Sequence, residues 1–155
     1  MAETEIRIKD IIPLALLYSA ESNQIEGRTR LQKLVFLAQD DLEDEGVDTL
    51  EYVPYKYGPF SKSLIEAIER FQQMGLLERS KQRTYGGSEK YVYNLTPKGN
   101  RTFQHNLEGD DNAEIFEKIL DVAQDTLNKH NKKSLDKLIN EVYEEHPEYA
   151  TESVY

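Results

Sequence analysis

The residue types that most often carry catalysis or hold metals are few in this chain and lie far apart. Its three histidines are His105, His130 and His146, and none has another histidine three or four positions away, as a helical metal pair would need. Cysteine is absent, which excludes a thiolate zinc site and a thiol nucleophile. Neither a G-x-S-x-G serine elbow nor a glycine-rich phosphate loop occurs. The sequence therefore indicates no enzyme, no metal and no cofactor.

Basic residues gather in the middle of an acidic chain. The 155 residues carry 29 Asp and Glu against 19 Lys and Arg, and this net charge of −10 excludes a globally basic nucleic-acid binder. Residues 51–100 reverse the balance, with 8 basic side chains against 5 acidic ones. Cations on a hairpin can bind phosphates, but they also keep exposed strand edges from pairing, and both interpretations stay open. The candidate nucleic-acid-binding residues are Lys62, Arg70, Arg79, Lys81, Arg83 and Lys90.

Residues 61–74 are expected to form the helix that would enter a DNA groove. The outward face of this helix carries the carboxylates of Glu66 and Glu69 beside its cations. Carboxylates repel phosphates, although a glutamate can accept a hydrogen bond from cytosine. This face therefore favours a protein ligand over DNA. The side chains expected to be buried on the opposite face are Leu64, Ile65, Ile68 and Phe71.

Tyrosines are concentrated just before this helix and along the hairpin that follows it. Tyrosine offers a large apolar area with a polar hydroxyl, which suits protein interfaces. Ordinary packing within a small sheet explains the same enrichment, because aromatic residues favour strands. The candidate partner-binding residues are Tyr55, Tyr57, Phe60 and Tyr85.

The apolar spacing arranges these residues on helices interrupted by short strands. The segment 50–57 is rich in strand formers but contains Pro54, which confines it to an edge strand, and residues 58–61 are expected to form a turn. Residues 77–95 alternate around a Gly-Gly turn, as in a hairpin. Three helices before a hairpin, with a strand between the second and third, indicate a winged helix-turn-helix. The expected fold is thus mainly α with a small β-hairpin (α+β), with additional C-terminal helices.

Short polar side chains mark the expected helix starts. Asp10, Ser61, Thr96 and Ser134 each precede an apolar periodic stretch and suit the N-cap position. Asp111 is followed three residues later by Glu114, which is the spacing of a capping box.

Two regions are expected, a winged-helix domain over residues 1–110 and a helical extension over 111–155 packed on the same core. The helix 111–129 carries an apolar band that is wide for a surface helix. Any part of this band that stays uncovered favours a homodimer through the C-terminal helices, and complete burial within one chain is the open alternative.

A cytoplasmic location without membrane contact is expected. The first five residues lack the basic and apolar regions of a signal peptide. The longest apolar run, from Ile11 to Tyr18, is too short to span a bilayer.

Several segments resemble the YwgA-like proteins and the related Panacea (SocA-like antitoxin) group. Residues 30–38 (RLQKLVFLA) resemble a helix of these families, and residues 55–61 (YKYGPFS) resemble their Tyr-Gly-Pro turn. Residues 74–77 and 93–99 match the helix exit and the hairpin return, and residues 141–149 (EVYEEHPEY) resemble a C-terminal segment of the YwgA-like branch. The resemblance implies no catalytic residue. It implies a protein that binds a toxin protein or acts as an adaptor, as Panacea-type members do.

The function expected from these observations is that of a non-enzymatic winged-helix interaction module. Its ligand would be a protein partner, as for an antitoxin-like or adaptor-like regulator. The alternative is a DNA-binding transcriptional regulator that uses helix 61–74 and the basic wing 79–90.

Overall fold

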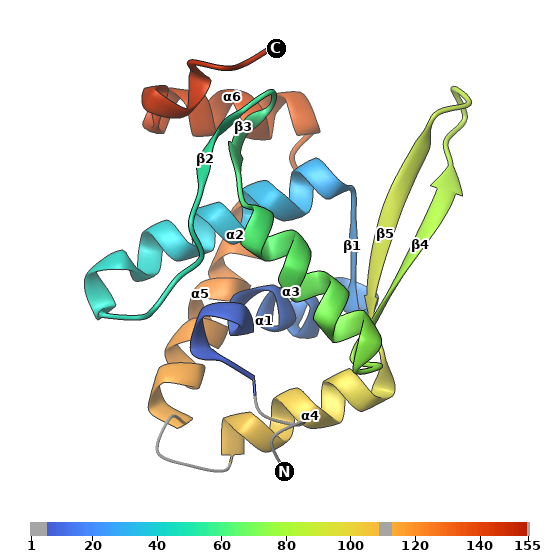
Figure 1. Cartoon of the computed structure of the whole chain (residues 1–155), viewed down its shortest axis with the longest axis vertical. Helices are drawn as coiled ribbons and strands as arrows, with labels where there is room; N and C mark the ends of the chain where they lie inside the picture. The colour runs from blue at the N-terminus through green and yellow to red at the C-terminus, as the bar shows by residue number, and fades with distance from the viewer. Residues whose placement is uncertain (1–5, 109–112, 155) are drawn as a thin grey trace.

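Helices and short antiparallel strands alternate along the chain, as a computed structural model shows (Figure 1). The structure describes residues 6–108 and 113–154. The fold is therefore mixed α and β. The α-helices are α1 (Ile11–Ser19), α2 (Arg28–Leu42), α3 (Lys62–Gln73), α4 (Pro97–Glu108), α5 (Ala113–His130) and α6 (Leu135–Glu145). The strands are β1 (Gln24–Glu26), β2 (Val53–Tyr55), β3 (Gly58–Phe60), β4 (Leu77–Arg83) and β5 (Glu89–Leu95).

Helix α1 lies at the centre of the hydrophobic core. Every residue from Ile11 to Leu17 is buried, and the segment contains no polar side chain. A helix that is apolar on all sides has to be surrounded, and α2, α4, α5 and β5 all contact it. No helix in the described part of the chain is long and apolar enough to cross a bilayer.

Strands β4 and β5 form the predicted hairpin, and β1 extends it to a sheet in the order β1-β5-β4. Leu77 lies opposite Leu95 at the base, and Ile25 of β1 lies opposite Tyr93. The hairpin projects beyond the helices (Figure 1). The sequence does not predict β1, because three residues are too few to show an alternating pattern.

The segment 53–60 is a second, separate hairpin. The expected single strand with a following turn is wrong, since residues 58–60 form β3 and pair with β2. Pro54 lies directly opposite Pro59. Neither proline has an N–H to donate to a further strand, so this two-stranded sheet stays small and apart from the first one.

Helix α3 begins as predicted. The Ser61 hydroxyl accepts a hydrogen bond from the backbone N–H of Leu64 at 3.1 Å, and Leu64, Ile68 and Phe71 are buried. The sequence predicts that Ile65 is buried on the same face of α3, but this residue is 38% exposed. Ile65 lies next to Leu64, about 100° around the helix, so it falls at the edge of the buried stripe.

Asp10 precedes α1 as expected but does not cap it. Its side chain makes no hydrogen bond to the first turn of α1 and is buried. Instead one carboxylate oxygen, Oδ2, accepts from Arg7 at 2.8 Å and from Arg70 of α3 at 2.9 Å. A buried carboxylate requires such partners, and these are stronger than one backbone N–H.

Helix α5 completes the core. Phe116, Ile119, Ala123 and Leu127 are buried against α1, α2 and α4, so this part of the apolar band is covered within the chain. The expected cap Asp111, and the expected boundary at residue 110, lie outside the described residues. Ser134 caps α6 as predicted, through a 3.2 Å bond from the N–H of Lys137.

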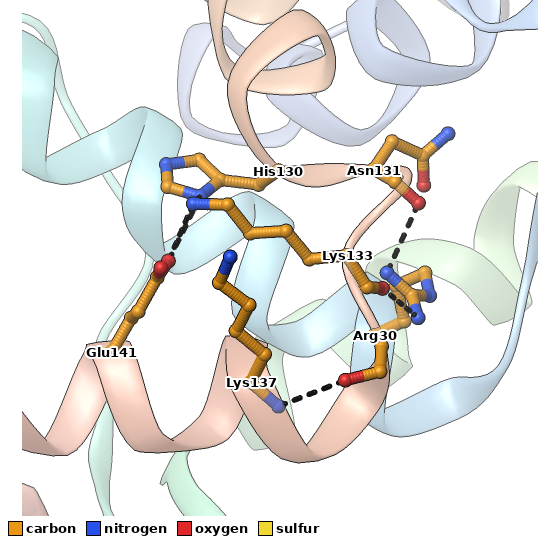
Figure 2. A network of polar contacts seen from close by, with 7 residues as sticks. Arg30, His130, Asn131, Lys133, Lys137 and Glu141 are labelled. Carbon is orange, nitrogen blue, oxygen red and sulfur yellow. Dashed lines mark hydrogen bonds and ion pairs between the residues drawn. The ribbon is translucent and has the colours of Figure 1, made fainter.

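The connection between α5 and α6 is held to α2 by a polar network (Figure 2). The Arg30 guanidinium donates to the backbone carbonyls of Asn131 at 3.1 Å and Lys133 at 2.8 Å. The Lys133 ammonium reaches both Glu141 and the ring of His130 (Figure 2). Burial lowers the pKa of His130, and the Lys133 charge lowers it further. A charged guanidinium thus satisfies the carbonyls that follow the last turn of α5.

We predict that α5 is required for folding. A chain that ends at residue 110 loses the four buried apolar side chains of α5 and three more of α6, and it should show no cooperative thermal unfolding by circular dichroism. In the full chain, Ile119→Ala should lower the free energy of unfolding by roughly 2–5 kcal/mol in urea titrations, because it opens a cavity beside α1.

The matched control is Glu117→Ala, which changes an exposed residue of the same helix and should cost less than about 0.5 kcal/mol. If residues 1–110 stay monodisperse and melt near the full-length temperature, α5 and α6 do not belong to the core.

Candidate functional site

A cleft of about 460 Å³ opens between the N-terminal half of α2, the tip of the β2–β3 hairpin, α3 and the three-stranded sheet β1-β5-β4. Four elements that are distant in the sequence meet there, which is typical of binding pockets. The residues that line the cleft are Arg28, Thr29, Leu31, Gln32, Lys33, Tyr55, Lys56, Tyr57, Gly58, Phe60, Leu64, Ile65, Ile68, Arg79 and Tyr93.

The mouth of the cleft is aromatic and apolar. The side chains of Tyr55, Tyr57 and Ile65 are 46%, 43% and 38% exposed. Phe60 packs against Tyr55 with 4.7 Å between ring centroids, so the hairpin presents a preformed aromatic surface. Exposed apolar groups that gather at one site mark a surface for a ligand, whereas scattered ones do not.

The charged side chains that line the cleft all have the same sign. They are Arg28, Lys33, Lys56 and Arg79, and no Asp or Glu is among the described residues of the lining. The sign is opposite to the net charge of the chain, so the cleft is a local positive region on an acidic protein.

Lys33 lies at the floor of the cleft and is only 2% exposed. Its ammonium donates to the carbonyl of Pro59 at 2.9 Å, and among the described residues no carboxylate forms an ion pair with it. Burial therefore lowers the pKa of Lys33 to about 8. A strongly shifted group in a cleft is a candidate functional residue.

Cations also gather around the ring of Tyr91 beside the cleft, and two of them, Arg28 and Arg79, line the cleft as well. We call this group the Tyr91 cluster. Around the Tyr91 ring lie Arg79, Arg28 and Lys81, with charged groups 4.6, 4.8 and 5.5 Å from its centroid. Arg79 and Lys81 come from β4 and Arg28 from the start of α2. The aromatic ring attracts cations, which offsets part of their mutual repulsion.

The residues predicted to bind nucleic acid do not form one surface. Arg79 and Lys81 belong to the Tyr91 cluster, but the Arg70 guanidinium pairs with Asp10 and Lys90 pairs with Glu26 at 2.9 Å. Lys81 also lies 3.8 Å from Glu89. Lys62 and Arg83 are exposed, on α3 and at the end of β4.

Of the residues predicted to bind a partner, three meet at the cleft. Tyr55, Tyr57 and Phe60 line it, whereas Tyr85 is fully exposed at the far end of the β4–β5 hairpin. Sequence reasoning missed Arg28, Lys33 and Ile65. The sequence offered one signal for these three residues: Lys33 is a charged residue that, with Gln32, interrupts an otherwise apolar segment from Leu31 to Ala38.

The histidines also lie apart. His105 is exposed on α4, His130 belongs to the network of Figure 2, and the ring of His146 is 3.2 Å from the carboxylate of Asp40. Within residues 6–108 and 113–154, no group of three or more potential ligand side chains is arranged to hold a metal ion.

We predict that Lys33→Met stabilises the protein. The pKa of about 8 in the fold, against 10.5 in the unfolded chain, corresponds to a penalty of roughly 3 kcal/mol for the buried charge. The unfolded chain binds more protons between these two values, so the penalty is complete below pH 8 and declines as the pH rises. The gain should be roughly 1–3 kcal/mol near pH 7 and less than about 1 kcal/mol near pH 10.

Urea titrations of the wild type and the variant at both pH values measure this difference. Lys132→Met, which removes an exposed lysine, serves as the control and should leave stability within about 0.5 kcal/mol at both. Destabilisation by Lys33→Met of the same size at both pH values would show that the ammonium is not a buried charge.

Comparison with known proteins places the chain in a family. Residues 40–132, well over half of the chain, match the family model described as Replication-relaxation. The chain is also 30% identical over 98 residues to YwgA of Bacillus subtilis (strain 168), which is described as an uncharacterized protein. This alignment covers 63% of the chain and 56% of YwgA, so the chain spans little more than half of that relative. The resemblance to YwgA is thereby supported, and the extent of the family match shows that the chain belongs to the replication-relaxation family.

Proposed function

We propose that this chain is a non-enzymatic winged-helix interaction module that binds a protein partner in the cleft. The observation that carries the proposal is the gathering of Tyr55, Tyr57, Phe60 and Ile65 around one opening. Large, partly exposed aromatic and aliphatic side chains at a concave site supply most of the energy of protein interfaces.

The order of the elements supports the winged-helix assignment. The α-helices and strands before the β4–β5 hairpin follow the order α1, β1, α2, β2, β3, α3, and β1 pairs with β5 to give the sheet order β1-β5-β4. In this arrangement α3 takes the position of a recognition helix and the hairpin that of the wing (Figure 1). The outer face of α3 carries Glu66 and Glu69, both exposed, which supports a protein ligand over a nucleic acid.

Three further parts of the proposal come from the sequence. An antitoxin-like or adaptor-like role follows from the resemblance to the Panacea group, and the cytoplasm is the expected location. A homodimer through α5 and α6 is the third, although the buried residues of α5 already pack within one chain.

The proposal predicts that a partner is lost when the mouth of the cleft is changed. Ile65→Asp places a charge in the apolar rim and should reduce recovery of the partner at least about tenfold in affinity capture from the native host. Quantitative mass spectrometry of the captured proteins gives the readout.

Tyr85→Ala is the control, because it removes a fully exposed aromatic side chain far from the cleft. Its captured proteins should equal those of the wild type. If no protein distinguishes the wild type from Ile65→Asp, or if Tyr85→Ala alone loses the partner, the cleft is not the binding site.

A second candidate function, DNA binding, is favoured by the Tyr91 cluster. Arg28, Arg79 and Lys81 converge at the base of the proposed wing, and cations there can contact phosphates. The name of the family refers to replication, which is a process that acts on DNA.

DNA binding predicts a salt-dependent affinity that depends on the wing. Replacement of Arg79, Lys81 and Arg83 by Ala should lower the slope of log affinity against log salt by about 2–3, since each phosphate contact contributes about 0.9. Fluorescence anisotropy with a labelled duplex between about 50 and 200 mM salt measures this slope.

The control replaces Lys129, Lys132 and Lys137 by Ala, which changes the net charge equally on the C-terminal helices. Absence of duplex binding at the lowest salt, or equal slopes for the two triple variants, would contradict this second function.

A further inference from the structure

We propose that the ligand of the cleft is an acidic peptide segment, with an aromatic or branched aliphatic side chain at the rim and a carboxylate paired with Lys33. This inference rests on the proposed function and adds the chemistry of the partner. Its anchor, Lys33, precedes residue 40, where the family match begins, and the sequence patterns do not assign Lys33 to a site.

Charge complementarity selects an anionic ligand. The cleft gathers Arg28, Lys33, Lys56 and Arg79 within one opening, although the chain as a whole has a net charge of −10. Two cations outside the cleft have acidic partners, Glu26 for Lys90 and Asp10 for Arg70. A ligand carboxylate would supply the charge that the lining lacks, and the low dielectric of a cleft strengthens such a pair.

Lys33 is the specific anchor. An ammonium has three donors, and the structure gives one acceptor to Lys33, the carbonyl of Pro59. Gly58 lies directly over its stem, and a Cβ built at Gly58 would come within 3.3 Å of Lys33 Cε and 3.0 Å of Tyr143 Cε1. The hairpin therefore packs tightly on the stem of Lys33, which holds the side chain against the cleft floor.

The rim selects a peptide over a nucleic acid. Tyr55, Phe60 and Ile65 offer an apolar surface at the mouth, which suits a side chain that follows or precedes the acidic one. A duplex laid along α3 would meet the exposed carboxylates of Glu66 and Glu69. The charged side chains that an extended peptide would meet in the described lining of the cleft are all cations.

The buried amine gives the inference a thermodynamic signature. Lys33 has a pKa of about 8, and a carboxylate beside it favours the ammonium form. The other titratable or charged side chains that line the cleft are Arg28, Tyr55, Lys56, Tyr57, Arg79 and Tyr93, and Tyr143 of α6 lies against Gly58 beside the stem of Lys33. None of these is a carboxylate. Binding of the acidic segment at pH 8 should therefore take up protons.

The first experiment is selection from a random-peptide library displayed on phage, with the full-length protein as the target and Ile65→Asp for counter-selection. The expected result is enrichment of peptides that combine two or more Asp or Glu with an aromatic or branched aliphatic residue. Enrichment of neutral or basic peptides that still depend on Ile65 would overturn this inference and leave the proposed function standing. Enrichment that Ile65→Asp does not affect would overturn both.

The second experiment is calorimetry of an enriched peptide in two buffers of different ionisation enthalpy. Wild-type protein should take up about half a proton at pH 8 and almost none near pH 6, where Lys33 is already charged. Lys33→Met should abolish the uptake and weaken binding about tenfold. Lys132→Met, the exposed control, should change neither quantity.

Equal proton uptake by the wild type and Lys33→Met would overturn the assignment of Lys33. Competition decides between ligand classes: a single-stranded oligothymidine that displaces the peptide from the wild type, and that binds directly to the wild type but not to Ile65→Asp, would overturn the peptide in favour of a nucleic acid.

Discussion

The side-chain amide of Gln32 is the contact on which the cleft depends. Its nitrogen donates to the carbonyl of Ser61 at 3.0 Å, and its oxygen accepts from the N–H of Ser61 at 2.9 Å. Gln39, two turns later on α2, holds Leu50 in the same two-bond manner. Both glutamines are buried, where an unpaired amide costs about 1–3 kcal/mol. The segment 50–61 is therefore fixed to α2 at both ends, and with it the β2–β3 hairpin and the start of α3.

This constraint explains why a buried lysine is tolerated in α2. Gln32 positions the chain at Ser61, and the carbonyl of Pro59, two residues earlier, then faces the ammonium of Lys33. The energetic cost of the buried charge is met by the rest of the core, in which α1 is surrounded by α2, α4 and α5. Functional sites commonly retain such unfavourable groups, because the surrounding structure holds them in place.

The cleft combines residues from inside and outside the region that matches the family. The hairpin tip, α3 and Arg79 lie within residues 40–132, whereas Arg28 and Lys33 precede residue 40. Helix α5 also lies entirely within the match, and its apolar side chains are buried beside α1. Helix α6 lies beyond it and, together with Phe36 and Leu37 of α2, forms a small second cluster of apolar side chains. The region that matches the family therefore supplies the rim of the site together with Lys56 and Arg79, and the first part of α2 supplies Arg28 and Lys33.

The sequence by itself determined the features that depend on neighbours within one helical turn or one hairpin. The caps Ser61 and Ser134 and the hairpin 77–95 were predictable, because each cap and its backbone partner lie three residues apart and the two strands pair across a single turn. In the cleft, the local concentration of aromatic residues was the basis for predicting Tyr55, Tyr57 and Phe60. Only the tertiary structure decided the rest. Asp10 forms an ion pair with Arg70, sixty residues away, and does not cap α1. Residues 24–26 form a strand because they pair with β5. Lys33 and Arg79 came together because α2 and β4 meet at the cleft. Such contacts depend on which elements pack together, and no pattern within one segment records that choice.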